Sequence, residues 1–241
     1  MVPKRSYHHG NLRQVLLDAG VALIGEVGPK GFTIREVARR AGVSHNAPYR
    51  HFQSKEELLA VIAAEGFERL ALAMKEHAAS GVTAVERLRL CGCGYVDFAL
   101  RWPQHFVAMF DLPSVPEQHP RREIVGKNAF ETLLAFIIDS QKQGSLPRGD
   151  PLPLALMAWS LVHGIAKLAT SGNLPYASGQ TLDFTRCASE AFVSGMRNLK
   201  VPRSRLSASS KSRSTVPQPD FITNHQVSGL NERNEFMLTK K

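Results

Sequence analysis

Residues 32–59 read FTIREVARRAGVSHNAPYRHFQSKEELL, and their pattern predicts a short helix followed by a tight turn. Thr33 has Glu36 three residues on, which is the spacing of a capping box, so a helix is expected to begin at Thr33. Gly42 is expected to end this helix, because glycine readily adopts the left-handed backbone that a tight turn requires. A helix this short is marginal on its own, so it must be held by packing on its neighbours.

A third helix is expected after the turn, from a cap at Ser44 to Phe52. Pro48 is tolerated in that helix only within the first turn. An amphipathic helix over residues 10–27 precedes both and completes a set of three. This order is that of a helix-turn-helix, in which the last helix lies exposed across the second and enters the major groove of DNA.

Side chains in and around the third helix suit contacts with double-stranded DNA. Asn can pair with adenine, His can donate to guanine or to phosphate, and Ala can contact a thymine methyl group. Other donors, together with the N–H groups at helix N-termini, suit phosphate oxygens. Taken singly, each residue also has an ordinary structural explanation, such as a core position for Tyr49; the combination favours DNA binding. The candidate DNA-binding residues are Thr33, Arg35, Ser44, His45, Asn46, Ala47, Tyr49, His51 and Lys55.

The distribution of charge agrees with a polyanionic partner. The 241 residues carry a net charge of +9. Residues 1–55 carry 9 Lys or Arg against 3 Asp or Glu, residues 56–199 carry 13 against 15, and residues 200–241 carry 8 against 3. A basic segment on a nearly neutral body is typical of a nucleic-acid-binding module. The basic tail, rich in Ser, Arg and Pro, is predicted to be disordered.

Composition excludes several classes of protein. A hydrophobic content of 43% is too high for a disordered chain. Three cysteines are too few for a disulfide framework and favour a reducing compartment, and residues 1–11 lack the apolar core of a signal peptide, so we expect a cytoplasmic protein. The apolar segment 152–169 contains His163 and Lys167, and we interpret it as a buried helix rather than a membrane span.

The stretch quoted above resembles the DNA-binding domain of the TetR/AcrR family of bacterial transcriptional regulators. The resemblance implies an all-helical homodimer, with three helices that bind DNA and a larger C-terminal domain that binds a small effector. It also implies that eight of the nine candidate residues, all except Ser44, lie where the family usually contacts DNA. Pro48 departs from the family pattern, in which many members carry Leu. Trp159, His163 and Gly164 match a WHG signature found in a subset of these regulators.

The rest of the chain is predicted to be helical as well. A second capping box at Ser54 and Glu57 is expected to begin a long helix that ends near residue 77 and links the DNA-binding part rigidly to the body. No convincing strand is found, so the fold class is all-α. Further helices are expected over residues 83–101, 104–110, 116–143, 151–170 and 180–199. The domains are a helix-turn-helix domain over 1–53, an effector-binding and dimerisation domain over 54–199, and the tail over 200–241.

The last two helices predict a dimer interface. The helix over 151–170 is apolar on nearly all sides and must be covered on nearly all sides. The helix over 180–199 carries small residues on one face, which lets another helix approach closely. The candidate interface residues are Ala188, Ala191 and Gly195. A larger monomeric core is the alternative explanation.

Aromatic side chains are dense between residues 98 and 136 and predict either an apolar effector pocket or an ordinary core. The candidate ligand-binding residues are Phe98, Trp102, Phe106, Phe110, Phe130, Trp159 and His163. Cys91 and Cys93 lie within a predicted helix and point about 200° apart, so shared metal binding is disfavoured. We expect no metal site and no cofactor.

Sequence signatures of the common enzyme classes are absent, since the chain has no phosphate loop, dinucleotide fingerprint or nucleophile elbow. We therefore predict a ligand-responsive, sequence-specific regulator, not an enzyme. In the resembled family such a protein is most often a repressor that binds a palindromic operator as a dimer and is released by a small molecule, here a hydrophobic one. The alternatives are an activator, a non-specific architectural DNA-binding protein and a small-molecule enzyme.

Overall fold

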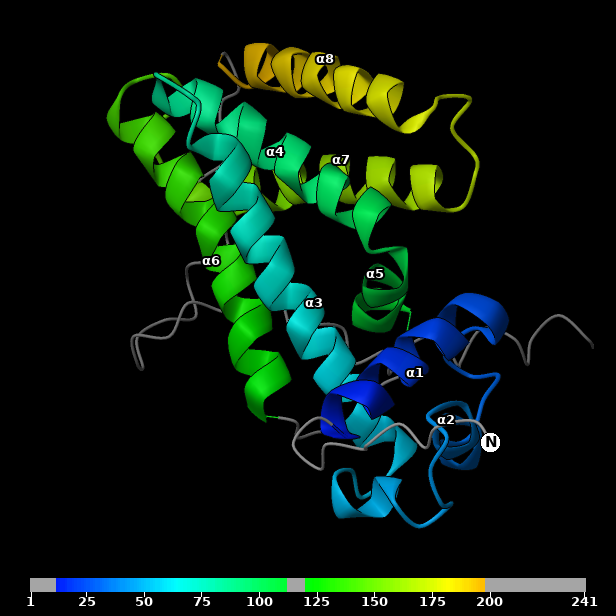
Figure 1. Ribbon diagram of the computed structural model, residues 1–241. Helices are drawn as coiled ribbons and strands as arrows, with labels where there is room; N and C mark the ends of the chain where they lie inside the picture. Colours follow the sequence, from blue (N-terminus) through cyan, green and yellow to red (C-terminus); the bar gives the residue numbers. More distant parts are fainter. Residues whose placement is uncertain (1–11, 112–119, 198–241) are drawn as a thin grey trace, which may run out of the picture.

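The computed structural model describes residues 12–111 and 120–197, and within these residues every regular element is helical (Figure 1). The all-α fold class is thereby confirmed. The α-helices are α1 (Leu12–Val27), α2 (Ile34–Arg40), α3 (Lys55–Ala78), α4 (Ala84–Arg101), α5 (Pro103–Phe110), α6 (Pro120–Lys142), α7 (Pro151–Thr170) and α8 (Ser178–Met196), and one 3-10 helix, η1, spans Pro48–Arg50. The predictions for residues 1–11, for Pro116 and for the tail over 200–241 lie outside the described residues.

Helix α1 packs against α2, α3 and α5, and η1 packs against α2; α1, α2, the turn and η1 form the head of the molecule. Leu16, Val37 and Phe52 are fully buried in its core. The capping box at the start of α2 is present, since the Glu36 N–H donates to Thr33 Oγ1 at 3.3 Å and the Thr33 N–H donates to Glu36 Oε2 at 2.7 Å. The short α2 is thus held by its cap and by packing, as the sequence predicts.

The predicted third α-helix over 44–52 is wrong. Only η1 is helical there, and Ser44 caps no helix. Pro48 has no N–H to donate to the Ser44 carbonyl, so that oxygen accepts from the Ala47 N–H at 3.0 Å in a turn instead. The chain therefore presents a turn and a single 3-10 helix where a recognition helix was expected.

Helix α3 runs from the head into the body, where it lies beside α4 and α6 (Figure 1). Its N-cap is Ser54, whose Oγ accepts from the Glu57 N–H at 3.2 Å. The predicted capping box is only half formed, because the Glu57 carboxylate accepts instead from the Gln53 N–H at 2.6 Å.

Helices α7 and α8 close the other end of the body, with both packed against α4. The predicted boundaries hold closely here. Pro103 and Pro151 occupy first-turn positions, and Asp150 Oδ1 accepts from the Leu152 N–H at 3.0 Å. Thr83 and Glu86 form a further capping box at the start of α4 that the sequence reasoning overlooked.

The prediction that α7 is a buried helix is only partly confirmed. Among the described helices, α7 alone is long and apolar enough to cross a membrane, and 33% of its most apolar window is buried. A core helix of a soluble protein passes the same test, so length and composition are weak grounds for a membrane span. Met157 and Leu168 lie on its exposed side.

Candidate DNA-binding surface and ligand cavity

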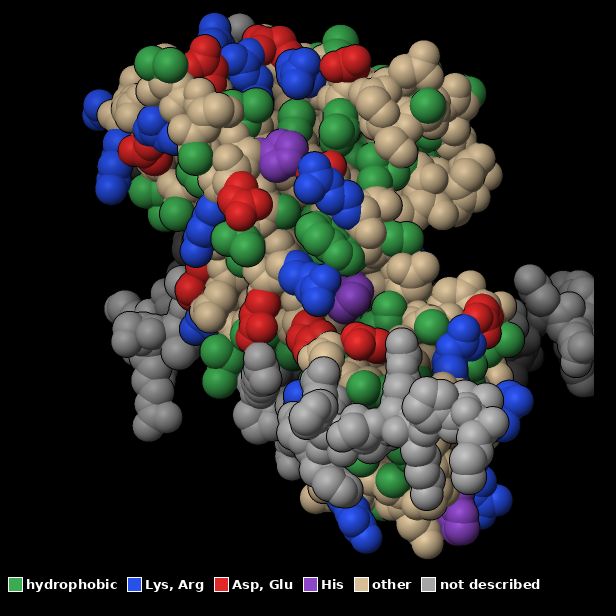
Figure 2. All heavy atoms as spheres, viewed as in Figure 1, with side chains coloured by type: hydrophobic (Ala, Val, Ile, Leu, Met, Phe, Trp, Pro, Cys, Tyr) green, Lys and Arg blue, Asp and Glu red, His purple; other side chains and the backbone are tan. Residues whose placement is uncertain are grey.

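The turn that leads into η1, and η1 itself, carry several exposed candidate DNA-binding side chains. His45 and Asn46 are exposed, and Tyr49 is 49% exposed although it lies beside the buried Pro48. In Figure 2, blue and purple side chains line the lower edge of the molecule, where Figure 1 places the head. This arrangement leaves donors and acceptors free to meet base edges and phosphates.

The remaining candidates divide into exposed and engaged side chains. Arg35 and Ser44 are exposed, whereas Ala47 and His51 are half-buried. Thr33 is exposed, but its hydroxyl donates to Glu36 Oε2 at 3.0 Å as part of the cap of α2. Thr33 can therefore offer DNA mainly the oriented N-terminus of α2.

Lys55 ties the start of α3 to the start of α2. Its Nζ donates to the carbonyl of Phe32 at 2.6 Å and to that of Lys30 at 3.2 Å, and it lies 4.5 Å from the centre of the Phe32 ring. Partial burial lowers the pKa of Lys55. Two of the three ammonium donors are used inside the protein, so this residue holds the head together whether or not it also contacts a phosphate.

Arg50 is a basic residue of this surface that the sequence reasoning missed. It is exposed in η1, one residue after Tyr49. Arg40 is committed elsewhere, because its guanidinium makes two hydrogen bonds of 2.6 Å with the Glu26 carboxylate. In the sequence, the feature that could have identified Arg50 as a candidate DNA-binding residue is its position directly after Tyr49.

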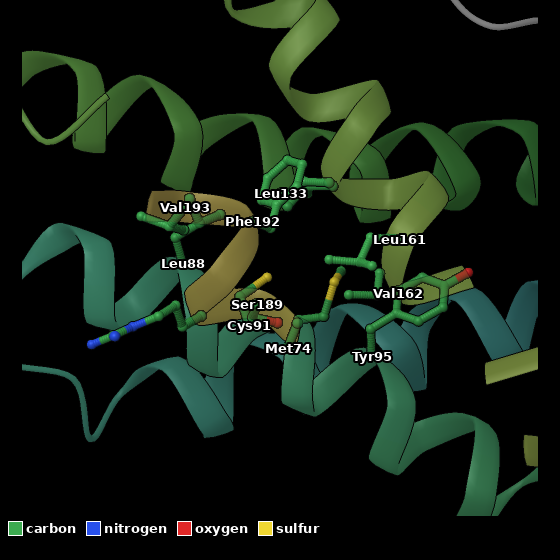
Figure 3. A pocket seen from close by; sticks show the side chains of 13 residues that line it. Met74, Leu88, Cys91, Tyr95, Leu133, Leu161, Val162, Ser189, Phe192 and Val193 are labelled. Atoms are coloured by element: carbon green, nitrogen blue, oxygen red, sulfur yellow. The ribbon is translucent and has the colours of Figure 1, made fainter. Parts of the chain in front are cut away.

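Two small cavities adjoin within the body. The first, of about 30 Å³, lies between α3, α4, α6, α7 and α8 (Figure 3), and the second, of about 20 Å³, reaches towards α5. Met74, Tyr95 and Leu133 line both cavities. Each has room for only one or two water-sized groups, so a larger molecule requires side chains to move.

Three of the predicted ligand-binding residues, Phe110, Phe130 and Trp159, line the second cavity. Phe98 and Phe106 are fully buried core residues and line neither cavity.

The other two predicted ligand-binding residues also stand back from the cavities. Trp102 is half-buried, and the Arg69 guanidinium lies 5.6 Å from the centre of its ring. His163 contacts Tyr95, which the sequence reasoning did not single out; the signal was a tyrosine within an apolar helix, whose hydroxyl needs partners.

Tyr95, Trp159 and His163 form a hydrogen-bonded group at the wall of the cavities. Trp159 Nε1 donates to the Tyr95 hydroxyl at 3.2 Å, and this hydroxyl lies 2.9 Å from His163 Nδ1. The Tyr95 hydroxyl has one proton and two lone pairs, so it accepts from Trp159 and either donates to Nδ1 or accepts from it, according to the tautomer of His163. Burial lowers the pKa of His163 and raises that of Tyr95, so both side chains stay neutral. Trp159 and His163, two residues of the WHG signature, thus join α7 to α4.

The candidate dimer residues lie on the outer side of α8. Ala191 and Gly195 are exposed and Ala188 is half-buried. Phe184, on the same side of α8, is 38% exposed.

The cysteines of α4 show no sign of reactivity. Cys91 and Cys93 are buried, and burial raises the pKa of Cys91 to about 12, so its thiol stays protonated. Within the ranges that the structure covers, no group of three His, Cys, Asp or Glu side chains could hold a metal ion.

Two family models match the chain. The model for bacterial regulatory proteins of the TetR family matches residues 16–62, and the model for a tetracyclin repressor-like C-terminal domain matches residues 88–188. The chain belongs to the TetR family. Among curated proteins, none matches it.

Several solved structures share this fold. A Rhodococcus sp. RHA1 protein of unknown function is 31% identical, with a TM-score of 0.69, over 80% of this chain and 100% of its own. FadR from Bacillus subtilis, solved with stearoyl-CoA, is 19% identical, with a TM-score of 0.63, over 76% and 98%. AibR, solved with isovaleryl coenzyme A and operator DNA, is 20% identical, with a TM-score of 0.59, over 73% and 96%. The last two likenesses show the shared fold.

Proposed function

We propose that this TetR-family chain is a repressor that binds a palindromic operator as a homodimer and releases it when a small hydrophobic molecule occupies the body. The observation that carries the proposal is that the side chains of His45 and Asn46 in the turn of the head, and of Tyr49 in η1, are exposed to solvent. The helix-turn-helix domain is assigned to residues 1–53 and the effector-binding and dimerisation domain to residues 54–199. The proposed place of action is the cytoplasm, where the DNA is.

The proposed dimer uses the exposed faces of α7 and α8. Exposed apolar side chains lie on both helices: Met157 and Leu168 on α7, and Phe184 and Ala191 on α8. Exposure of such a surface to water is unfavourable, which favours its burial against a partner. Two copies of this helix pair would bury it as a four-helix bundle. Such a dimer sets the distance between the two heads, which must be roughly 34–36 Å to meet successive major grooves on one side of DNA.

Helix α3 is the element that couples the two parts. It begins at Lys55, beside the head, and it contributes Phe67, Leu70 and Met74 to the cavities. A molecule that moves these side chains would shift α3 and hence the head. The change in DNA affinity that such a molecule causes is set by how much more tightly it binds one arrangement of α3 and the head than the other.

The neighbouring structures support both halves of this function. FadR was solved with a long-chain acyl-CoA, and AibR was solved with a branched acyl-CoA together with operator DNA. For the present chain, the apolar cavity lining supports an effector with an apolar portion.

Selection of bound duplexes from random DNA tests the proposal. A regulator should enrich an inverted repeat and prefer it to random DNA by at least about 10³-fold. An architectural protein would show little discrimination, and such a result would refute the proposed function.

A further inference from the structure

Ser189 carries a buried hydroxyl group that opens onto the first cavity (Figure 3). The side chain lies on α8 and is 4% exposed, and its Oγ has no hydrogen-bond partner among the described residues. A serine inside a helix ordinarily donates to the carbonyl four residues back. Thr185 does so one turn earlier, with its Oγ1 2.7 Å from the Thr181 carbonyl. The Ser189 hydroxyl therefore retains its hydrogen-bonding capacity for something in the cavity.

The surroundings of this hydroxyl are apolar and carry no unpaired charge. Aliphatic and aromatic side chains form most of the wall, among them Leu88, Leu133, Leu161, Val162, Phe192 and Val193. Arg89 is the one lining residue with a charged side chain, and it is paired with Glu190. The thiol of Cys91 stays protonated because burial raises its pKa. An ionic group in this cavity would be desolvated without a counter-charge.

We propose that the first cavity is a binding site for a small, neutral, mainly aliphatic molecule whose single oxygen, a hydroxyl or a carbonyl, is hydrogen-bonded by Ser189. This inference rests on the proposed function and names the chemical class of the effector. Because Ser189 lies on α8, the bound oxygen contacts the helix whose outer side forms the proposed dimer face.

Met74 explains how a ligand whose alkyl chain is longer than the first cavity is accommodated. It lines both cavities, and methionine has three rotatable bonds and adapts its shape readily. Rotation of its side chain joins the two spaces, so an unbranched chain extends from Ser189 towards Phe110 and Trp159. Trp159 then reports occupancy by its fluorescence.

The test uses the full chain with Trp102→Phe, which leaves Trp159 as the one remaining tryptophan. The probes are n-hexanol, n-hexane and hexanoate, which share chain length but differ in the oxygen and the charge. We expect n-hexanol to bind about tenfold more tightly than n-hexane, as one buried hydrogen bond provides, and hexanoate to bind more weakly than n-hexanol. In Ser189→Ala the preference for the alcohol over the alkane should disappear. The matched control Ser194→Ala, at an exposed serine of the same helix, should keep it.

A second variant tests the position of the site. A Cβ added at Gly92 would lie 3.3 Å from Ser189 Oγ and 3.1 Å from Val162 Cγ1, so Gly92→Ala narrows the space beside the hydroxyl. Alanine also favours the helix, so the variant should fold, and its affinity for n-hexanol should fall severalfold.

An alcohol preference that survives in Ser189→Ala, or wild-type protein that binds no n-hexanol, would overturn the inference. The DNA selection is run in parallel and separates the two proposals. DNA discrimination without alcohol binding refutes only this site, whereas alcohol binding without DNA discrimination refutes only the regulator.

Discussion

Asn46 is the residue through which base discrimination is expected to be most direct. It is exposed in the turn before η1, and its amide can both donate to and accept from adenine in the major groove. Lys55 acts differently, because its ammonium group holds the carbonyls of Lys30 and Phe32. We therefore expect the polar residues of this motif to divide between contact with DNA and support of the head.

Replacement Asn46→Ala should change the preferred base at one position in each half-site and cost about 1–3 kcal/mol of discrimination there. The side chain is exposed, so stability should not change. Repeated selection from random DNA measures the preference, with the remote exposed variant Lys142→Ala as the control. An unaltered site logo would show that other residues read the bases.

His105 makes the stability of the protein depend on pH. Its ring is buried between α5 and α3, neither ring nitrogen has a hydrogen-bond partner among the described residues, and Glu65 Oε2 lies 4.0 Å from Nε2. Burial, followed by the charge of Arg69, lowers the pKa of His105 from its ordinary value of 6.5 to about 4. The folded state therefore holds the neutral ring and resists protonation.

The free energy of unfolding should be fully retained above pH 6.5 and should fall by about 3 kcal/mol as pH decreases from 6.5 to about 4. Urea unfolding across this range measures it. In His105→Phe the decrease should be much smaller, with a remainder from His163, whose pKa is also lowered by burial. The exposed variant His45→Gln is the control and should keep the full decrease; the same decrease in His105→Phe would assign it to another group.

At the scale of the elements, the crossing of α3 and α4 depends on a glycine. A Cβ added at Gly94 would lie 2.5 Å from the carbonyl oxygen of Ala73, on the backbone of α3. Two glycines in α4 suggest a soft helix when the sequence is considered alone. The structure gives each a spatial reason, since Gly94 permits a close crossing and Gly92 opens onto the first cavity.

Gly94→Ala should destabilise the protein by about 1–3 kcal/mol, because the contact with backbone cannot relax by rotation of a side chain. Alanine would otherwise stabilise a helix by up to about 1 kcal/mol. The control is Gly179→Ala, where an added Cβ meets nothing within 4 Å. Urea unfolding of both variants compares them, and equal stability would show that α3 and α4 separate without cost.

For the whole molecule, the proposed dimer determines whether two heads can meet one operator. The head and both cavities are formed within a single copy of the chain, whereas recognition of an inverted repeat needs two copies. The exposed apolar sides of α7 and α8 are the surface available for it.

Ala191→Arg should give a folded monomer, because the side chain is exposed in one copy but would meet the partner in the dimer. Sedimentation should report half the wild-type mass, and operator affinity should fall by at least tenfold. Ser194→Arg, on the charged side of α8, is the matched control and should remain dimeric. A dimeric Ala191→Arg protein would move the interface elsewhere.

Local chemistry in the sequence was sufficient to predict the helices and most of their ends. The cap at Thr33, the cap at Asp150 and the first-turn prolines depend on residues within about four positions of one another. The turn at Gly42 has the predicted left-handed backbone, with φ of 68°. Two local predictions were wrong: Pro48 lacks the N–H that the predicted helix over 44–52 needs, and the capping box predicted at Ser54 is only half formed.

The site inside the body depends on tertiary structure. Tyr95 meets His163 across 68 positions of the chain and Trp159 across 64, and no local pattern specifies such pairs. The packing of α3 to α8 decides which of the aromatic residues predicted to bind a ligand line a cavity and which belong to the core. Apart from residues 44–52, sequence alone determined which of the described segments are helical, because hydrogen bonds within a helix join near neighbours. Tertiary structure decided which side chains line the cavity, because that depends on how distant helices pack.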